Sequence, residues 1–199
     1  MGHQHKMNLK ELLSNKRAVV IDNFLDLEIN NNLQETILNS RFPFFYFQET
    51  VKNTDRQMSK LTNEIESGQF THIVIDKRKA SSSYFNQIHN MLFNKIHLLF
   101  NNELNFYRAK INLKLPHPKA NLDSFDIPHT DVDSKSYSMI YYINDTDGDT
   151  FFFDDNGNIV DRINPIKNRL LIFDSCHKHA AGFPVIHNNR VVINMVIDQ

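Results

Sequence analysis

The apolar positions of the chain change their spacing near its middle. In the first half, residues 26–40 and 83–100 carry apolar side chains at near-helical intervals, so both segments are predicted to form helices. A short β-branched run, Ala18–Ile21, predicts a strand ahead of them. From residue 106 onward, short segments rich in Ile, Val, Phe and Tyr alternate with turn residues, which is typical of strands. These predicted strands are 106–115, 127–131, 137–144, 149–154, 158–163, 169–174, 178–182 and 190–197.

The sequence between two of these strands carries a hairpin signal. Asp155-Asn156-Gly157-Asn158 contains Asn-Gly, which is favoured in short hairpins because both turn residues must accept a positive φ. About eight antiparallel strands joined by such turns predict a double-stranded β-helix, or jelly roll, for the second half. The predicted fold class is therefore α+β, with N-terminal helices that support the jelly roll.

The length of the chain indicates one domain. Its 199 residues suffice for one well-buried core, and no Gly/Ser-rich or Pro-rich linker divides them. We expect a single domain over 1–199, in which 1–105 provides mixed helix and strand support and 106–199 forms the core with the candidate site. The sequence gives no indication of the oligomeric state.

Charge and cysteine content give no support to some classes of partner. The 22 basic and 23 acidic residues give a formal net charge of −1, so no overall field attracts nucleic acid or an anionic membrane. The short basic cluster Lys77-Arg78-Lys79 is typical of a solvated loop. No apolar run approaches the roughly 20 residues that cross a bilayer, and the single cysteine, Cys176, allows no internal disulfide. We therefore expect a cytoplasmic protein without nucleic-acid or membrane partners.

Residues that commonly bind metals follow two of the predicted strands. His129 and Asp131 occupy alternate positions, so their side chains project to the same face and can bind one ion. Asp133 continues this alternation and is an alternative ligand, although it lies further into the following loop. Downstream, His177 and His179 compete for a third position. Two neutral imidazoles and one carboxylate form a facial triad, which suits Fe(II) and leaves three coordination positions open.

These candidates belong to a longer series of elements that spans roughly residues 106–198. In chain order the elements are Pro128-His129-Thr130-Asp131, Ile140-Tyr141-Tyr142-Ile143-Asn144, Gly148-Asp149-Thr150-Phe151-Phe152, Asn168-Arg169-Leu170-Leu171-Ile172-Phe173-Asp174-Ser175, His179 and Arg190-Val191-Val192-Ile193-Asn194. Together they resemble the 2-oxoglutarate/Fe(II) oxygenase superfamily. The resemblance is to its prolyl-4-hydroxylase-like branch, and to the small stand-alone members found in phages and bacteria.

The resemblance chooses among the histidines. In the family, the distal histidine lies six positions after the Phe that ends the preceding strand, which selects His179 over His177. His187 lies only three residues before Arg190 and fits less well still. The implied catalytic and metal-binding residues are His129, Asp131 and His179.

The resemblance also implies residues that bind the co-substrate. Arg190 matches the residue that, in relatives such as the animal oxygen-sensing prolyl hydroxylases, holds the distal carboxylate of 2-oxoglutarate with two parallel donors. Tyr142 matches a tyrosine whose phenol binds the same carboxylate, whereas Tyr141 should point away by strand alternation. Asn194 shares a face with Arg190 and is the third cofactor-binding candidate. Thr150 is a weaker candidate, since a strand threonine is often only a good β former.

Two positions depart from parts of the family. Collagen-type relatives carry Lys where this chain has Arg190, which argues against a collagen-type enzyme. Oxygen-sensing relatives carry Tyr where the alignment places Leu115, which argues against close identity with the oxygen sensors. Arg190 and Tyr142 are therefore the expected main anchors for the co-substrate.

The implied activity is that of a 2-oxoglutarate- and Fe(II)-dependent dioxygenase that hydroxylates an organic substrate, with O₂ as co-substrate and ascorbate as a further cofactor candidate. Asp131, in place of Ala or Gly, favours hydroxylation over halogenation. A peptidyl proline is the leading substrate by analogy, and a small metabolite or a nucleic acid are alternative substrates. A jelly roll that only binds a ligand, without catalysis, is the alternative to an enzyme. Candidate walls of the substrate channel are the aromatic run 41–48, which also fits core packing, and the loops 116–125 and 133–136.

Overall fold

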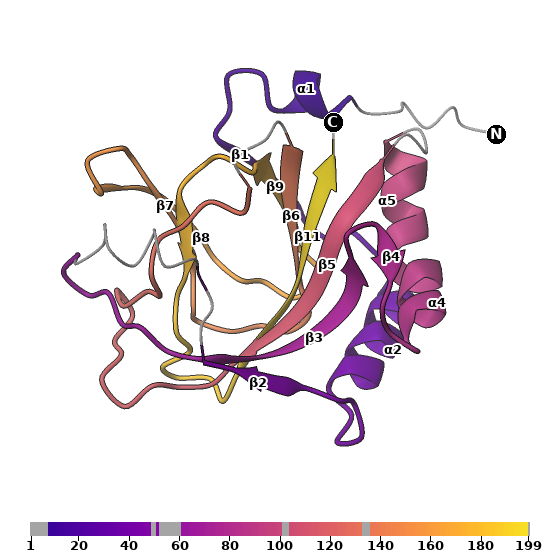
Figure 1. Cartoon of the computed structure of the whole chain (residues 1–199), viewed down its shortest axis with the longest axis horizontal. Coiled ribbons are helices and arrows are strands. Elements are labelled where there is room, and N and C mark those ends of the chain that lie inside the picture. Colours follow the sequence, from indigo (N-terminus) through magenta and orange to yellow (C-terminus); the bar gives the residue numbers. More distant parts are fainter. Residues whose placement is uncertain (1–7, 49–50, 52–60, 101–103, 133–135, 199) are drawn as a thin grey trace.

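The computed structural model describes residues 8–48, 51, 61–100, 104–132 and 136–198 (Figure 1). Two antiparallel sheets carry most of the described chain, and the helices lie along one face of the larger sheet. No helix within this described part is long and apolar enough to cross a membrane.

The larger sheet has eight strands in the order β1-β9-β6-β11-β5-β3-β2, with β4 paired to β3. Its strands are β1 Ala18–Ile21, β2 Phe45–Phe47, β3 Gln69–Asp76, β4 Lys79–Ala80, β5 Asn105–Lys114, β6 Ser136–Tyr142, β9 Leu170–Asp174 and β11 Arg190–Asp198. Long pairings of β11 with both β5 and β6 place the C-terminal strand at the centre of the sheet.

The smaller sheet has the order β10-β7-β8, formed by His179–Ala181, Thr150–Phe153 and Ile159–Ile163. Its Phe152 packs against Leu171, Phe173 and Val192 of the larger sheet, so the two sheets share one interior. This arrangement confirms the predicted jelly roll. The predicted hairpin also connects β7 and β8, although among its turn residues only Gly157 has a positive φ, of 83°.

The predicted strand 127–131 is wrong. This segment is extended, but only His129 forms an isolated bridge, to His179. Pro128 has no N–H to donate to a ladder, and Asp131 donates its N–H to Ser175 O at 3.2 Å instead of to a neighbouring strand. The segment therefore touches β10 through one bridge and forms no strand of either sheet.

The helices cover the outer face of the larger sheet. The predicted helix 26–40 is shorter, as α2 Leu27–Ile37, and a short α1 spans Leu9–Leu12. The predicted helix 83–100 forms as α4 Phe85–Ile88 and α5 Asn94–Leu99 with a π-helical segment, His89–Phe93, between them. A π segment has a wider turn than an α-helix, and two residues within this one, Leu92 and Phe93, are fully buried.

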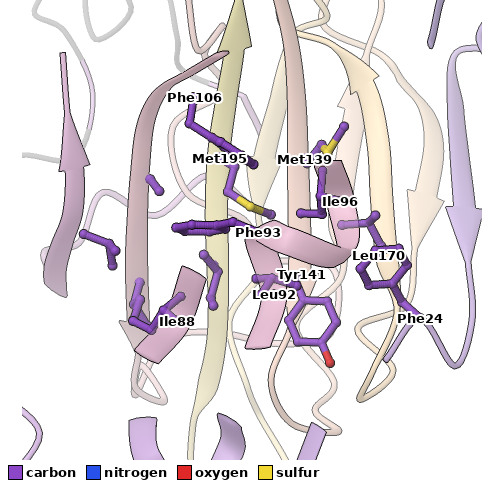
Figure 2. Packing of buried hydrophobic residues seen from close by; sticks show 14 of the residues in the cluster. Phe24, Ile88, Leu92, Phe93, Ile96, Phe106, Met139, Tyr141, Leu170 and Met195 are labelled. Carbon is purple, nitrogen blue, oxygen red and sulfur yellow. The ribbon is translucent and has the colours of Figure 1, made fainter. Parts of the chain in front are cut away.

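Figure 2 shows how this helix meets the sheet: Phe93 lies beside Met195 of β11, with Ile96 near Met139 of β6. Adjacent residues of β6 point to opposite faces of the sheet. Tyr141 donates to Asn30 Oδ1 on the helix side at 2.8 Å, whereas Tyr142 packs in the interior of the jelly roll. Strand alternation therefore separates an apolar face under the helices from the face that encloses the site.

The first half contributes more strand than its sequence pattern indicated. β3 pairs with β5 and extends the larger sheet, and Lys77 and Arg78 form the turn to β4 with positive φ of 47° and 66°. The aromatic run 41–48 divides between two environments. Phe42 is buried in the core, whereas β2, with three exposed aromatic residues, forms the edge of the sheet.

Candidate active site

Two imidazoles are held at the open end of the jelly roll by their own backbones. His129 and His179 each donate the backbone N–H to the other's carbonyl, both at 2.9 Å. Their Nδ1 atoms contact the carbonyls of Ile127 at 3.1 Å and His177 at 3.0 Å. Because a carbonyl can only accept, Nδ1 carries the proton in both rings and Nε2 is free to bind a metal.

Asp131 completes the cluster, in which the three ligand atoms all lie within 4.8 Å of one another. Its Oδ2 accepts from Ser138 Oγ at 2.6 Å and lies 3.7 Å from His179 Nε2. Its Oδ1 accepts from Arg108 Nη2 at 2.5 Å. These partners fix the orientation of the carboxylate, as outer contacts do in metal sites.

The protonation states suit a metal site. Burial lowers the pKa of His179 to about 4, so the ring is neutral at pH 7. Burial alone would raise the pKa of Asp131, but its interactions with His179, Arg108 and His129 and the Ser138 hydrogen bond bring it down to about 2. A neutral imidazole and an ionised carboxylate are the forms that bind metal. The donor set therefore fits Fe(II), as a buried two-histidine, one-carboxylate cluster.

The three residues open into a cavity of about 330 Å³ between the two sheets. β5, β6 and β11 of the larger sheet and β7 and β10 of the smaller one contribute side chains to its walls. Polar and charged side chains in its lining include Arg108, Lys110, Asn112, Lys114, Asp126, Thr150, Arg190 and Asn194.

Arg190 lies in the same cavity as the triad and is 3% exposed. Its Nε donates to Gly148 O at 2.6 Å and its Nη2 to Thr150 Oγ1 at 2.9 Å. A Cβ at Gly148 would lie 2.9 Å from Arg190 Cδ, so this position requires glycine. Tyr142 OH lies 2.7 Å from the same Thr150 hydroxyl and behind the cavity wall. Thr150 is thus the hydroxyl that meets the cavity, between Arg190 and Tyr142.

Asn194 also faces the cavity, and its Oδ1 is buried without a hydrogen-bond partner among the described residues. Leu115 lies outside the cavity and is 48% exposed. Its neighbour Lys114 enters instead, where it forms an ion pair with Asp126 and lies 4.3 Å from the centre of the Phe183 ring. The position that the alignment gave to Leu115 is therefore filled by a cation.

The competing candidates lie elsewhere. His177 Nδ1 contacts Arg17 O at 3.1 Å, and His187 Nδ1 contacts Asp147 Oδ1 at 2.8 Å in an exposed loop. Asp133 lies outside the described residues, as does most of the loop 133–136.

The polar face of β5 lines the cavity, although none of the sequence motifs includes it. Arg108, Lys110, Asn112 and Lys114 all line the cavity, whereas Ala109 and Ile111 between them are buried in the core under the helices. A signal was present in the sequence, since polar and apolar residues alternate along this strand. The alternation does not by itself tell which face meets solvent and which meets a cavity.

No protein-family model matches this sequence, and no curated protein is similar to it. Solved structures do match. A Trichoplax adhaerens prolyl hydroxylase in complex with a peptide fragment of the hypoxia inducible factor oxygen degradation domain is 16% identical, with a TM-score of 0.66 over 96% of this chain and 87% of that one.

Two further matches cover a similar share. A 2OG-Fe(II) oxygenase family oxidoreductase from Burkholderia pseudomallei is 14% identical, with a TM-score of 0.68 over 96% of this chain and 89% of that one. The 2-oxoglutarate-dependent epimerase SnoN from nogalamycin biosynthesis is 12% identical, with a TM-score of 0.64 over 96% and 82%. The chain therefore has the fold of the 2-oxoglutarate/Fe(II) oxygenases. Prolyl hydroxylases are among the structures that share it, as the resemblance predicted.

Proposed function

We propose that this protein is a 2-oxoglutarate- and Fe(II)-dependent dioxygenase that hydroxylates an organic substrate. One observation carries the proposal: the cluster of buried Asp131 and His179 with half-buried His129 shares a cavity with a buried arginine, Arg190. A jelly roll that only bound a ligand would need neither the converging metal donors nor the arginine in the same cavity.

His129 Nε2, His179 Nε2 and a carboxylate oxygen of Asp131 would hold the iron. When bound, Fe(II) supplies the oxygen activation that hydroxylation of a C–H bond requires, coupled to conversion of 2-oxoglutarate and O₂ to succinate and CO₂. The Ile127 and His177 carbonyls accept from the Nδ1 atoms of His129 and His179, and so aim the two Nε2 atoms at the proposed metal position. Ascorbate remains a candidate reductant.

Arg190 and Thr150 are proposed to bind the distal carboxylate of 2-oxoglutarate. The guanidinium is positioned by Gly148 O, and the Thr150 hydroxyl is positioned in turn by Tyr142 OH. A charge-assisted hydrogen bond in a partly dry cavity is stronger than a neutral one, so Arg190 is expected to contribute most. Tyr142 therefore acts through Thr150, and Asn194 offers a further amide at the cavity wall.

The substrate class is open between two analogies. The Trichoplax relative holds a peptide, which supports a peptidyl proline, whereas SnoN belongs to the biosynthesis of a small molecule, which supports a metabolite. Neither analogy decides for this chain, because one fold hosts many chemistries.

The proposal is tested by incubating the purified protein with Fe(II), 2-oxoglutarate and ascorbate and measuring succinate. We expect slow succinate formation without substrate, and faster formation with +16 Da products when a library of peptides and metabolites is added. His177→Ala serves as the matched control for His179→Ala. Equal succinate formation by the wild-type protein and His179→Ala would contradict the proposal.

A further inference from the structure

The cavity face of β5 carries an unusual row of cations. Strand alternation points Arg108, Lys110 and Lys114 into the cavity, together with the amide of Asn112. In the paired strand β11, Arg190 lies directly opposite Lys114, and Asn194 lies opposite Lys110. The row therefore has a deep end at Lys114 and an outer end at Arg108 and Lys110.

The deep end has partners or a proposed ligand. Lys114 forms an ion pair with Asp126, and Arg190 donates to Gly148 O and Thr150 Oγ1. The distal carboxylate of 2-oxoglutarate is the proposed counter-ion of Arg190. No further anion is needed at this end.

The outer end has cations in excess. Arg108 contacts Oδ1 of Asp131, and its Nε is buried without a partner among the described residues. Lys110 makes no ion pair or hydrogen bond with another residue in the described ranges, and burial and Arg108 lower its pKa. Unpaired polar groups in a half-buried wall cost free energy unless a ligand pairs with them.

The charge balance shows what kind of ligand would pair with them. The cavity wall carries four cationic side chains, Arg108, Lys110, Lys114 and Arg190, against two carboxylates, Asp126 and Asp131. Binding of Fe(II) adds two positive charges and 2-oxoglutarate adds two negative ones, so the loaded site keeps an excess of about two positive charges. Arg108 has five N–H donors, enough to hold Asp131 and a second anion together.

We propose that Arg108 and Lys110 bind the acidic group of a small organic acid, either a carboxylate or a phosphate monoester, which is the substrate of this site. The inference rests on the proposed function for the identity of the reaction. Because Arg108 touches a metal ligand, the acidic group would bind beside the iron, and the oxidised carbon would lie within a few bonds of it. A cavity of about 330 Å³ fits a small molecule better than a folded partner.

The test uses two simple anions as probes. Protein loaded with Mn(II) and saturating 2-oxoglutarate is titrated with inorganic phosphate or with ¹³C-carboxyl acetate, and the ³¹P or ¹³C line broadening by the nearby Mn(II) is measured. We expect saturable broadening of at least one probe. Lys110→Met should weaken that binding by roughly tenfold or more, because it removes a charge-assisted contact, and Lys110→Arg should restore most of it. Lys79→Met, an exposed lysine on β4, is the matched control and should change nothing.

The outcomes separate this inference from the proposed function. Retention of Mn(II), measured first by electron paramagnetic resonance, tests the metal centre by itself. If the metal is retained but neither probe is broadened, or if Lys110→Met broadens as wild type does, the anion site is refuted while the oxygenase proposal stands. If the metal is not retained, calorimetric titration of both anions into metal-free wild type and Lys110→Met still tests the site. An acidic peptide that binds with roughly tenfold higher affinity than both small anions would refute the small-acid part of the proposal.

Discussion

The two faces of the larger sheet are built from the same strands but serve different ends. Along β11, Val191, Ile193 and Met195 are fully buried under the helices, while the alternate residues Arg190 and Asn194 face the cavity. On the apolar face, these three side chains pack into the hydrophobic core beneath the helices. The cavity face contains polar groups that the described protein leaves without partners. Successive side chains of β11 thus alternate between the core and the cavity, so substitutions one position apart should affect stability in one case and function in the other.

The largest expected effect is on the cavity face, at the metal cluster. His129→Ala, Asp131→Ala and His179→Ala should each reduce iron-dependent turnover to background, since a three-ligand site rarely survives the loss of one ligand. His177→Ala should retain most activity, because its side chain contacts Arg17 O outside the cavity. Activity and iron content of the four purified variants are measured together. Iron-loaded, active His179→Ala beside inactive His177→Ala would reverse the choice of distal ligand.

The next effect sharpens the contrast between neighbours. Ile193→Ala leaves a cavity under the helices and should lower the free energy of unfolding by about 2–5 kcal/mol, with little change in 2-oxoglutarate affinity. Asn194→Ala should change the free energy of unfolding by less than about 1 kcal/mol, because it removes a carbonyl that has no partner among the described residues. Urea denaturation of both variants checks this. A larger loss for Asn194→Ala than for Ile193→Ala would show that the two faces do not divide the work in this way.

A smaller effect orders the residues at the deep end of the cavity. Arg190→Ala should weaken the apparent affinity for 2-oxoglutarate by roughly ten- to a hundredfold, with Arg190→Lys between, because the charge-assisted contact is lost. Thr150→Val should weaken it less, and Tyr142→Phe least, since Tyr142 lies behind the cavity wall and supports Thr150 and Arg190 from there. Anaerobic titration of the Fe(II) protein, followed by the metal-to-ligand charge-transfer band, measures each midpoint. Tyr142→Phe with a greater loss than Thr150→Val would place the phenol at the carboxylate.

The smallest expected effect concerns pH. The pKa of His179 is about 4 in the folded protein against an ordinary value of 6.5, so the unfolded chain binds more protons between these values. Its contribution to the stability of the metal-free protein is therefore complete above about pH 6.5 and is lost as the pH falls toward about 4. His179→Gln should flatten this part of the pH dependence in urea denaturation, whereas His177→Gln should not. Equal slopes for wild type and His179→Gln would contradict the assignment.

The jelly roll was predicted from local patterns of strands and turns, whereas the choice of His179 over His177 came from the family resemblance. His129 and Asp131 are two positions apart, and His179 follows a strong apolar strand, so short-range spacing carries the information. Their role as iron ligands remains part of the proposal, although the structure does bring the three together. The prediction of a strand at 127–131 was wrong, because a segment joins a sheet only if a neighbouring strand has free backbone groups to pair with.

The remaining parts of the site could not be read in the same way. Lys114 lines the cavity and Leu115 does not, because neighbouring residues of an extended chain point to opposite faces, and the motifs gave no sign that Lys114 would enter the site. Whether the polar face of β5 meets water or a cavity depends on β7 and β10, which follow it much later in the chain. The link from Tyr142 through Thr150 to Arg190 is likewise set by how the two sheets approach each other.

The reciprocal backbone bonds between His129 and His179 have a consequence for how the centre is assembled. These bonds of 2.9 Å fasten two segments that are fifty residues apart in the chain, and they involve main-chain atoms alone. Bringing the ends of such a loop together costs conformational entropy, and the main-chain hydrogen bonds between His129 and His179 help to offset it when the chain folds. An ion at the proposed centre would therefore meet imidazoles that main-chain pairing already holds together, and little of its binding energy would be consumed in ordering the chain. Unlike a zinc finger, which is unfolded without its metal, this protein should keep its shape through repeated loss and recovery of the ion.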